Sequence, residues 1–384
     1  MRRVLIGAGV TAAAAVLLGC APSEQGSPTP EPSSSSASAE PTSTPSPTPT
    51  QTEAEAAVEA MSVRERAASV VMGTIATTDA DELASYMAEG YGGFILMGDN
   101  VSGGNDELTA VTDALIVDPE VPPLIAIDQE GGVVSRLSWD DAATAQTLQT
   151  APVDDARAAF QRRGELVAAA GANVNFGIVA DVPLDASSFI APRALGTDAA
   201  SVSERVAAAV EGESGQVYST LKHFPGHGAA PGDSHSSIPS TDLGYDAWLE
   251  ADARPFAAGI DAGAELLMFG HLDYTAVDDE PASLSARWHE IAREELGFDG
   301  VMITDDLGML ASSGDAAYAD PVANAVDAIA AGNDMVLMIA TSTRSTAGEM
   351  ADGIAAAVAD GTIPEERLAD AAERVMQLRL DAAA

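Results

Sequence analysis

Eight short apolar runs alternate with alanine-rich amphipathic stretches from about residue 56 onward, and this alternation most constrains the fold of the chain. The runs are continuously apolar, as expected for parallel strands that are covered by helices on one face and packed on the other. Eight β/α units in one chain predict an α/β fold of the single (β/α)8, TIM-type barrel class. The predicted strands span 69–76, 92–98, 123–128, 173–180, 217–223, 265–271, 300–305 and 334–340, and the predicted helices include 200–213, 244–260 and 319–331.

Polar side chains follow several of these predicted strands at the point where each strand ends. They are Asp128 after the third strand, Asp181 after the fourth, Lys222 and His223 at the end of the fifth, His271 at the end of the sixth and Asp305 at the end of the seventh. Active sites of (β/α)8 barrels form at the carboxyl ends of the strands and in the loops that follow them. The sequence therefore predicts one polar site on one rim of the barrel.

The segment from Lys222 to His235 concentrates titratable side chains. It reads Lys-His-Phe-Pro-Gly-His-Gly, continues through a loop of small residues and ends in Asp-Ser-His. Lys222 is the only lysine of the chain, which indicates a contact that a planar guanidinium does not replace. A purely structural turn would explain the proline and the glycines, but not Lys-His before the turn and Asp-x-His after it. We therefore expect this segment to carry function.

The first twenty residues have the pattern of an export signal. Arg2 and Arg3 precede an apolar run that is too short to span a membrane comfortably, which favours a signal peptide over 1–20. Leu-Leu-Gly-Cys at the end of this run resembles a bacterial lipobox, and the resemblance implies that Cys20 is lipidated. The alternative is a buried free thiol or an accidental cysteine. As the only cysteine, Cys20 leaves no partner for a disulfide within the chain.

Residues 21–55 are rich in Ser, Pro, Thr, Glu and Ala, a composition that does not bury enough apolar surface to fold. We interpret this segment as a flexible linker between the signal and a folded domain over 56–384. Such a linker would hold the domain at the outer face of the cytoplasmic membrane. A single lipidated residue with more than one acyl chain would anchor it stably.

The formal net charge of −41 argues against binding to nucleic acid, whose phosphates would be repelled. Most acidic residues are interpreted as a solubilising surface, and adaptation to salt stays an open alternative. We expect a monomer. No cysteine–histidine cluster indicates a metal, and no glycine-rich loop indicates a nucleotide, so we expect no cofactor.

Four sequence pieces together resemble family 3 glycoside hydrolases of the β-N-acetylhexosaminidase type. They are Ile-Asp-Gln-Glu-Gly-Gly around Asp128, Phe-Ile-Ala-Pro-Arg ending at Arg193, the Lys222–His235 segment, and Gly-Phe-Asp-Gly-Val-Met-Ile-Thr-Asp-Asp-Leu-Gly-Met around Asp305. The similarity extends from about residue 60 to the C-terminus. It implies a retaining, exo-acting β-N-acetylglucosaminidase that releases N-acetylglucosamine from cell-wall glycans.

The resemblance also implies the catalytic groups. Asp305 aligns with the attacking aspartate of the family, and His235 with the acid/base, with Asp233 as its partner. Retention needs one group that attacks the anomeric carbon and another that protonates the departing oxygen. Imidazole titrates near neutrality and suits the second task. We interpret Asp306 as a cap of the following helix, because successive residues of a strand point to opposite faces.

Substrate contacts are implied for five further residues: Asp128, Arg136, Arg193, Lys222 and His223. Charge-assisted hydrogen bonds from such groups fix the orientation of a polar sugar. The alternative for each is an ion pair of the barrel rim. The chain departs from the family pattern at Val133, where a basic residue is common, and at Phe269-Gly-His271.

Three alternatives remain open at this point. A phosphorylase of the same family would use phosphate in place of water, and a β-glucosidase would accept a sugar without the acetamido group. A surface lipoprotein that binds glycans without catalysis is disfavoured, because binding alone would require none of Asp305, Asp233 and His235.

Overall fold

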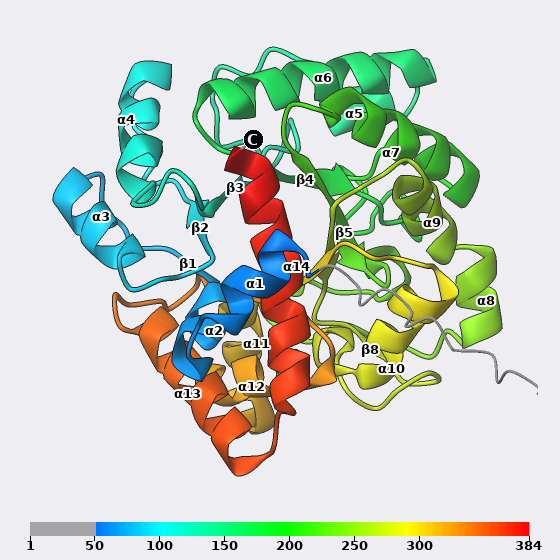
Figure 1. Ribbon diagram of the computed structural model, residues 1–384. Coiled ribbons are helices and arrows are strands. Elements are labelled where there is room, and N and C mark those ends of the chain that lie inside the picture. The colour runs from blue at the N-terminus through cyan, green and yellow to red at the C-terminus, as the bar shows by residue number, and fades with distance from the viewer. Residues whose placement is uncertain (1–50, 384) are drawn as a thin grey trace, which may run out of the picture. The chain divides into compact units, whose positions relative to one another are not determined.

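Eight parallel strands form a closed barrel in the order β1-β2-β3-β4-β5-β7-β9-β10 (Figure 1). The computed structural model describes residues 51–383; the predicted signal peptide, Cys20 and the linker up to residue 50 lie outside these residues. The strands are β1 Val71–Gly73, β2 Gly93–Leu96, β3 Leu124–Ile127, β4 Val174–Val179, β5 Tyr218–Phe224, β7 Leu266–Phe269, β9 Val301–Asp306 and β10 Met335–Leu337. All eight predicted strands and the predicted barrel are confirmed.

Helices surround this barrel on the outside (Figure 1). They are α2 Val63–Ser69, α3 Ala80–Met87, α4 Asn105–Leu115, α5 Ala145–Leu148, α6 Val153–Ala169, α7 Ala199–Glu213, α8 Tyr245–Glu250, α9 Ala253–Asp261, α10 Ala286–Glu290, α11 Leu307–Ala311, α12 Pro321–Ala331 and α13 Thr346–Asp360. A short two-stranded sheet, β6 Ser240–Thr241 with β8 Asp273–Tyr274, lies outside the barrel. None of the helices within 51–383 combines the length and the apolar character needed to cross a bilayer.

The predicted helix over 244–260 is wrong as one element, because the chain forms α8 and α9 with a break at Ala251. Pro255 explains the break: it has no amide hydrogen, and its ring would clash with the carbonyl of Ala251 in a continuous helix. The predicted helix over 319–331 begins two residues late, at Pro321, where Asp320 caps it. Proline is favoured at this first helical position.

The folded part begins before the predicted end of the linker. Helix α1 spans Glu53–Glu59, so the last three residues assigned to the linker are helical. Thr52 accepts a hydrogen bond from the amide of Glu55, whose carboxylate accepts one from the amide of Thr52, which is a capping box. Ala54 and Val58 are buried, and α1 contacts the C-terminal helix α14.

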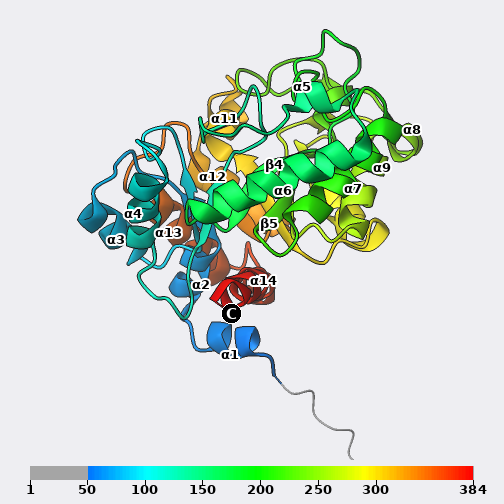
Figure 2. The ribbon, with the colours of Figure 1, turned by 90° about the horizontal axis from the view of Figure 1, so that it is seen from above.

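Helix α14, Glu365–Ala383, covers the amino-terminal end of the barrel (Figure 2). Val375 joins the cluster of apolar side chains that fills the barrel interior. The Tyr218 hydroxyl, at the start of β5, donates to the carbonyl of Leu378 at 2.8 Å. Arg379 donates to the carbonyls of Val121 and Pro122 ahead of β3, at 2.9 and 3.0 Å. These contacts fix α14 across this end of the barrel.

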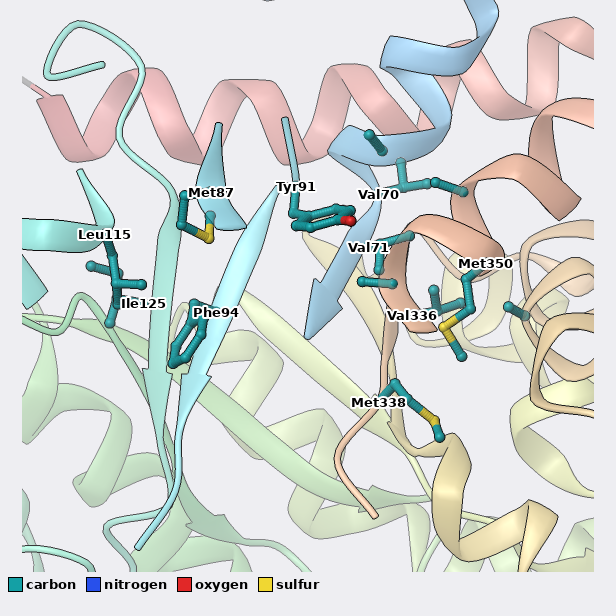
Figure 3. Packing of buried hydrophobic residues seen from close by; sticks show 14 of the residues in the cluster. Val70, Val71, Met87, Tyr91, Phe94, Leu115, Ile125, Val336, Met338 and Met350 are labelled. Carbon is teal, nitrogen blue, oxygen red and sulfur yellow. The ribbon is translucent and has the colours of Figure 1, made fainter. Parts of the chain in front are cut away.

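The helices are held to the barrel by apolar side chains from both layers. Figure 3 shows one such region, in which Val71 of β1, Phe94 of β2 and Val336 of β10 pack near Met87 of α3 and Met350 of α13. These side chains are buried. The outer face of each strand is thus covered, which explains why the strands read as continuous apolar runs.

Candidate active site

A pocket of about 400 Å³ lies at the carboxyl-terminal rim of the barrel. This volume falls in the range of small-ligand sites. Seven of the eight residues that the sequence assigned to a site within 51–383 line it: Asp128, Arg136, Arg193, Lys222, His223, His235 and Asp305. The eighth, Asp233, contacts His235. The structure thus brings together residues from β5, β9 and the loops that follow β3, β4 and β5.

Lys222 lies between two carboxylates of the segment that follows β3. Its Nζ is 3.0 Å from Asp128 Oδ1 and 2.8 Å from Glu130 Oε1, and its side chain is 3% exposed. Arg136 binds the other oxygen of Asp128 at 3.1 Å. Burial alone would raise the pKa of Asp128, but Lys222 and Arg136 outweigh it and hold that pKa at about 2. The same carboxylates raise the pKa of Lys222 despite its burial.

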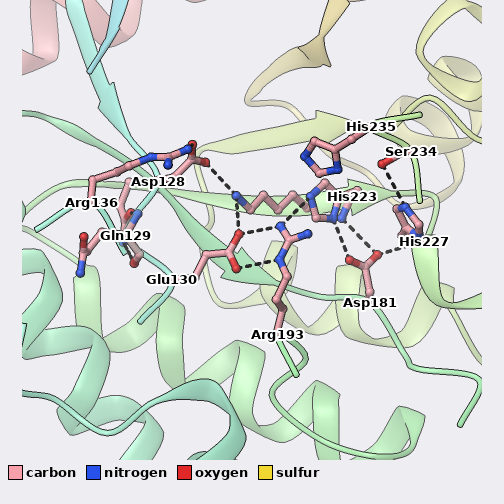
Figure 4. Close-up of polar contacts among 12 residues, drawn as sticks. Asp128, Gln129, Glu130, Arg136, Asp181, Arg193, His223, His227, Ser234 and His235 are labelled. Atoms are coloured by element: carbon pink, nitrogen blue, oxygen red, sulfur yellow. Dashed lines mark hydrogen bonds and ion pairs between the residues drawn. The ribbon is translucent and has the colours of Figure 1, made fainter. Parts of the chain in front are cut away.

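Glu130 is a site residue that the sequence reasoning missed. Its two oxygens accept hydrogen bonds from Arg193 at 2.9 and 2.7 Å in a bidentate pair (Figure 4). Burial opposes ionisation, yet Lys222 and Arg193 lower the pKa of Glu130 below its ordinary value. Residues two apart in an extended segment point to the same side. Asp128 at the end of β3 was therefore the available signal for Glu130.

Replacing Glu130 with glutamine is expected to lower the free energy of unfolding by about 3 kcal/mol, because it leaves Lys222 and Arg193 buried with one counter-charge fewer. Denaturant unfolding followed by circular dichroism measures the change. Glu365→Gln is the matched control, since Glu365 pairs with Arg66 at an exposed position. This control should change stability by less than about 1 kcal/mol. Equal losses in the two variants would contradict the role assigned to Glu130.

Asp181 organises two histidines from beneath the pocket. One oxygen lies 2.8 Å from His223 Nδ1, and the other accepts the backbone amides of His223 and His227 at 3.2 and 2.6 Å. Arg193 Nη2 is 3.2 Å from His223 Nε2. A guanidinium only donates, so Nε2 of His223 accepts and Nδ1 carries the hydrogen given to Asp181. These contacts give His223, which lines the pocket, a fixed tautomer.

A buried polar network holds the segment after β3 that carries Asp128 and Glu130. Asn175 exchanges hydrogen bonds with the backbone of Gln129, at 3.1 and 3.2 Å, and donates to Glu213 Oε1 at 2.5 Å. Ser219 donates to the other oxygen of Glu213 at 2.8 Å. Because Gln129 lies between Asp128 and Glu130, this network fixes the segment that holds both.

The stability of the protein is expected to fall as pH rises from about 5 to 8, and Glu213→Gln should remove part of that fall. Burial raises the pKa of Glu213 from 4.5 to about 8. A raised folded-state pKa means that the native state holds the proton of Glu213 more tightly than the unfolded chain does. The contribution of this proton to the free energy of unfolding is therefore complete below pH 4.5 and is lost as the pH approaches 8. Melting temperatures at pH 5 and pH 9 measure it. Parallel pH curves for the two proteins would contradict this assignment.

Asp305 and Asp306 end β9 and point to different surroundings. Asp306 caps α11, accepting the amide of Gly308 at 2.8 Å, and also accepts the amides of Ile339 and Ala340 at 2.7 and 2.8 Å. The predicted capping role of Asp306 is confirmed. Asp305 is partly exposed in the pocket, and although burial opposes it, His223 and His271 lower the pKa of its carboxyl. Asp305 is therefore ionised at neutral pH.

His271 lies one layer behind these carboxylates. It is buried, with Nε2 2.9 Å from the carbonyl of Asp306 and Nδ1 2.7 Å from the Ser283 hydroxyl. Burial lowers its pKa. It positions the end of β9.

His235 lies on the loop between β5 and β6. Its Nδ1 is 2.8 Å from Asp233 Oδ1, and the two side chains are 61% and 45% exposed. Two contacts hold the loop at this point: Nε2 of His227 lies 3.1 Å from the Ser234 hydroxyl, and the ring centroids of Phe189 and His235 lie 5.9 Å apart. His235, labelled in Figure 4, thus lines the pocket from an exposed position.

The first turn of that loop is held from below. Trp248 Nε1 donates to the carbonyl of Pro225 at 2.8 Å, and the Tyr274 hydroxyl donates to the carbonyl of Gly226 at 2.6 Å. Both donors are fully buried. Gly226 has a φ of 133°, a backbone conformation that a side chain at this position would strain. The loop therefore leaves β5 in one direction, over the pocket.

The chain matches the Glycosyl hydrolase family 3 N terminal domain over residues 62–378. It belongs to glycoside hydrolase family 3. The protein is thus a glycoside hydrolase, which confirms the prediction from the sequence. Within residues 51–383 no group of three or more His, Cys, Asp and Glu side chains is arranged to hold a metal.

Proteins similar to this chain include a β-hexosaminidase and two solved structures of hexosaminidases. It is 33% identical to a β-hexosaminidase of Methylobacillus flagellatus, over 64% of this chain and 73% of that protein. A solved family 3 β-N-acetylglucosaminidase from Paenibacillus sp. FPU-7 is 29% identical with a TM-score of 0.78, covering 85% of this chain and 64% of its own. A β-N-acetylhexosaminidase from Beutenbergia cavernae is 31% identical with a TM-score of 0.75, covering 83% and 98%.

Proposed function

We propose that the protein is a retaining, exo-acting β-N-acetylglucosaminidase. One observation carries the proposal: Asp305 and His235 line the same pocket, which also holds the charged set of Asp128, Lys222 and Arg193. A pocket of about 400 Å³ suits a single pyranose. The similarity to β-hexosaminidases of family 3 supports this sugar class.

The proposed reaction has two steps. Asp305 attacks the anomeric carbon and forms a glycosyl ester, while His235 gives its proton to the departing oxygen and the bond to the leaving group breaks. His235 then takes a proton from water, whose oxygen attacks the anomeric carbon and frees Asp305. Asp233 holds the His235 ring through the contact between its Oδ1 and His235 Nδ1.

The charged set at β3 and β5 supports exo action. Asp128, Lys222 and Arg193 are tied together by ion pairs. These groups would bind the hydroxyls at the non-reducing end of the sugar. Because α14 covers the opposite end of the barrel, the sugar has no passage beyond them. The chain would therefore remove one terminal residue at a time.

Aryl glycosides test this function directly. The protein should release aryl alcohol from an aryl β-N-acetylglucosaminide at a far higher kcat/KM than from the aryl β-glucoside. The reverse order would favour the β-glucosidase alternative, and binding without any turnover would favour a non-catalytic glycan-binding protein.

Phosphate separates the hydrolase from the phosphorylase of the same family. The three cations of the pocket, Lys222, Arg136 and Arg193, each pair with a carboxylate of the protein, which leaves little attraction for phosphate. We expect N-acetylglucosamine as the product in the presence of phosphate. The formation of a sugar-1-phosphate would contradict the assignment of the protein as a hydrolase.

The location of the enzyme and its natural substrate are part of the same proposal. Export and lipidation at Cys20 would place a monomeric domain at the outer face of the cytoplasmic membrane, beside cell-wall glycans. The Cys20→Ala protein should leave the membrane fraction, whereas the unaltered protein stays in it. Unchanged membrane association of the variant would contradict lipid anchoring.

The expected monomeric state is tested separately, by analytical sedimentation of the folded domain.

A further inference from the structure

A buried carboxyl group lies beneath the turn that begins the loop between β5 and β6. It belongs to Asp252, between α8 and α9, which is 6% exposed. A Cβ atom placed on Gly226 of the turn would lie 3.2 Å from Cβ and 3.3 Å from Oδ1 of Asp252. The carboxyl group therefore packs against the backbone of the turn. The proposed reaction does not use it.

Helix capping does not explain the presence of Asp252. The residue occupies the N-cap position of α9, where an aspartate ordinarily accepts hydrogen bonds from the amides of the first helical turn. Its side chain forms no such hydrogen bond, and its backbone is already helical, with φ −71° and ψ −28°. The start of α9 thus leaves the carboxyl group to the turn above it.

A negative charge on Asp252 would have no cation beside it. Within residues 51–383 the only donor that favours its ionised form is its own backbone amide, and Arg254 on the same helix is exposed. The titratable groups that face it from other elements are the Tyr274 hydroxyl of β8 and the carboxylate of Asp181 after β4. The Tyr274 hydroxyl donates its hydrogen to the carbonyl of Gly226. The surroundings of Asp252 therefore favour its protonated form.

Asp181 is the carboxylate of this pair that keeps its charge. Burial opposes ionisation, yet His223 and His227 lower the pKa of Asp181 below its ordinary value. Burial and the charge of Asp181 raise the pKa of Asp252 from 3.8 to about 7. Two carboxyl groups whose surroundings push their pKa values apart take different roles. Below pH 7 the pair holds one charge, on Asp181, and one proton, on Asp252.

The turn is the part of these surroundings that would respond to a charge on Asp252. The carbonyls of Pro225 and Gly226 are each held by one hydrogen bond from a buried side chain. A buried charge without a partner is costly, and a displacement of the turn that admits water relieves this cost. The same turn leads into the loop that carries His235.

We propose that Asp252 is a positioning residue, whose proton keeps the turn at Pro225 and Gly226 in place and thereby holds His235 at the pocket. This inference rests on the proposed function, because it concerns the residue that donates the proton to the leaving group. Loss of the proton from Asp252 makes proton donation by His235 less effective. Attack by Asp305, which lies on β9, does not depend on it.

Asp252→Asn tests this proposal through the pH profile, since the amide has the shape of the protonated carboxyl group and no charge at any pH. The substrate is N,N′-diacetylchitobiose, whose leaving group needs a proton. The kcat/KM of the variant should match that of the unaltered protein within about twofold at pH 6 and exceed it about tenfold at pH 8, where a group with a pKa of about 7 is mostly ionised. The titration of His235 lowers both values and cancels in their ratio.

A dinitrophenyl β-N-acetylglucosaminide and a second variant provide the controls. The dinitrophenyl leaving group needs no proton, so the ratio of the two proteins should stay near one at both pH values. Asp261→Asn removes a carboxyl group from an exposed position on the same helix and should behave as the unaltered protein. A ratio for Asp252→Asn that is the same at pH 6 and pH 8 overturns the proposal, and so does an equal change on both substrates.

A spectroscopic titration separates this inference from the proposed function. The indole of Trp248 donates to the carbonyl of Pro225 and reports on the turn without any substrate. Its fluorescence, identified by comparison with Trp248→Phe, should show a transition near pH 7 in the unaltered protein that Asp252→Asn lacks. If no glycoside is hydrolysed, the proposed function fails, and this titration still decides on Asp252. Identical titrations of the two proteins would overturn the role of Asp252.

Discussion

Replacing Asp305 with asparagine is expected to lower kcat on an aryl β-N-acetylglucosaminide by at least about 10⁴-fold, the order seen when a nucleophilic group is removed. The carboxylate is ionised at neutral pH because His223 and His271 lower its pKa. An amide of the same shape keeps the pocket intact but does not form the glycosyl ester. Steady-state kinetics on the purified proteins measure the loss.

Asp306→Asn is the matched control for this variant. The Asp306 carboxylate accepts three backbone amides and lies against α11, so its loss should reduce stability by about 1–3 kcal/mol while turnover persists.

A second variant, Asp305→Gly, tests the nucleophile directly. Added azide should restore turnover and yield a glycosyl azide of inverted configuration, since azide occupies the space of the missing carboxylate. Full activity of Asp305→Asn, or a larger kcat loss in Asp306→Asn, would exchange the roles of the two aspartates.

His235→Ala should separate substrates by the quality of their leaving group. Hydrolysis of a glycan with an unactivated sugar leaving group should fall by about 10²–10⁴-fold, the range of general acid catalysis. Hydrolysis of a dinitrophenyl glycoside should lose far less in its first step, because that leaving group departs without a proton. A plot of log kcat/KM against the pKa of the leaving group measures the difference between the proteins.

Two controls locate this effect in the acid/base role. Asp233→Asn removes the charge beside His235 Nδ1 and should shift the pH profile of kcat/KM with a smaller loss of rate. Phe189→Leu removes the aromatic contact with His235 but no titratable group. Equal losses on activated and unactivated substrates in His235→Ala would argue against proton donation and indicate that the residue only shapes the loop.

The barrel could be predicted from the sequence because most of its strands are buried on both faces and read as apolar runs, such as Leu124–Ile127 and Met335–Leu337. The predictions were wrong at the end of the linker and in the helix over 244–260, where capping and proline signals decide the local structure. Thr52 and Glu55 have the spacing of a capping box, and that signal marks the start of α1 inside a segment assigned to the linker by its composition. Pro255 likewise marks the break that divides α8 from α9.

The site residues that belong to recognisable sequence motifs could be predicted. Asp128, Lys222 and Asp305 lie at strand ends, and the register of a parallel barrel brings such ends together. Glu130 was missed although its spacing from Asp128 indicates it.

The contact between α1 and α14 places the first helix of the folded part beside the covered end of the barrel. Both helices lie at the end of the barrel opposite to the pocket, so the chain enters the folded part on its closed side (Figure 2). Immobilisation through the N-terminus should for the same reason leave access to large glycans unhindered.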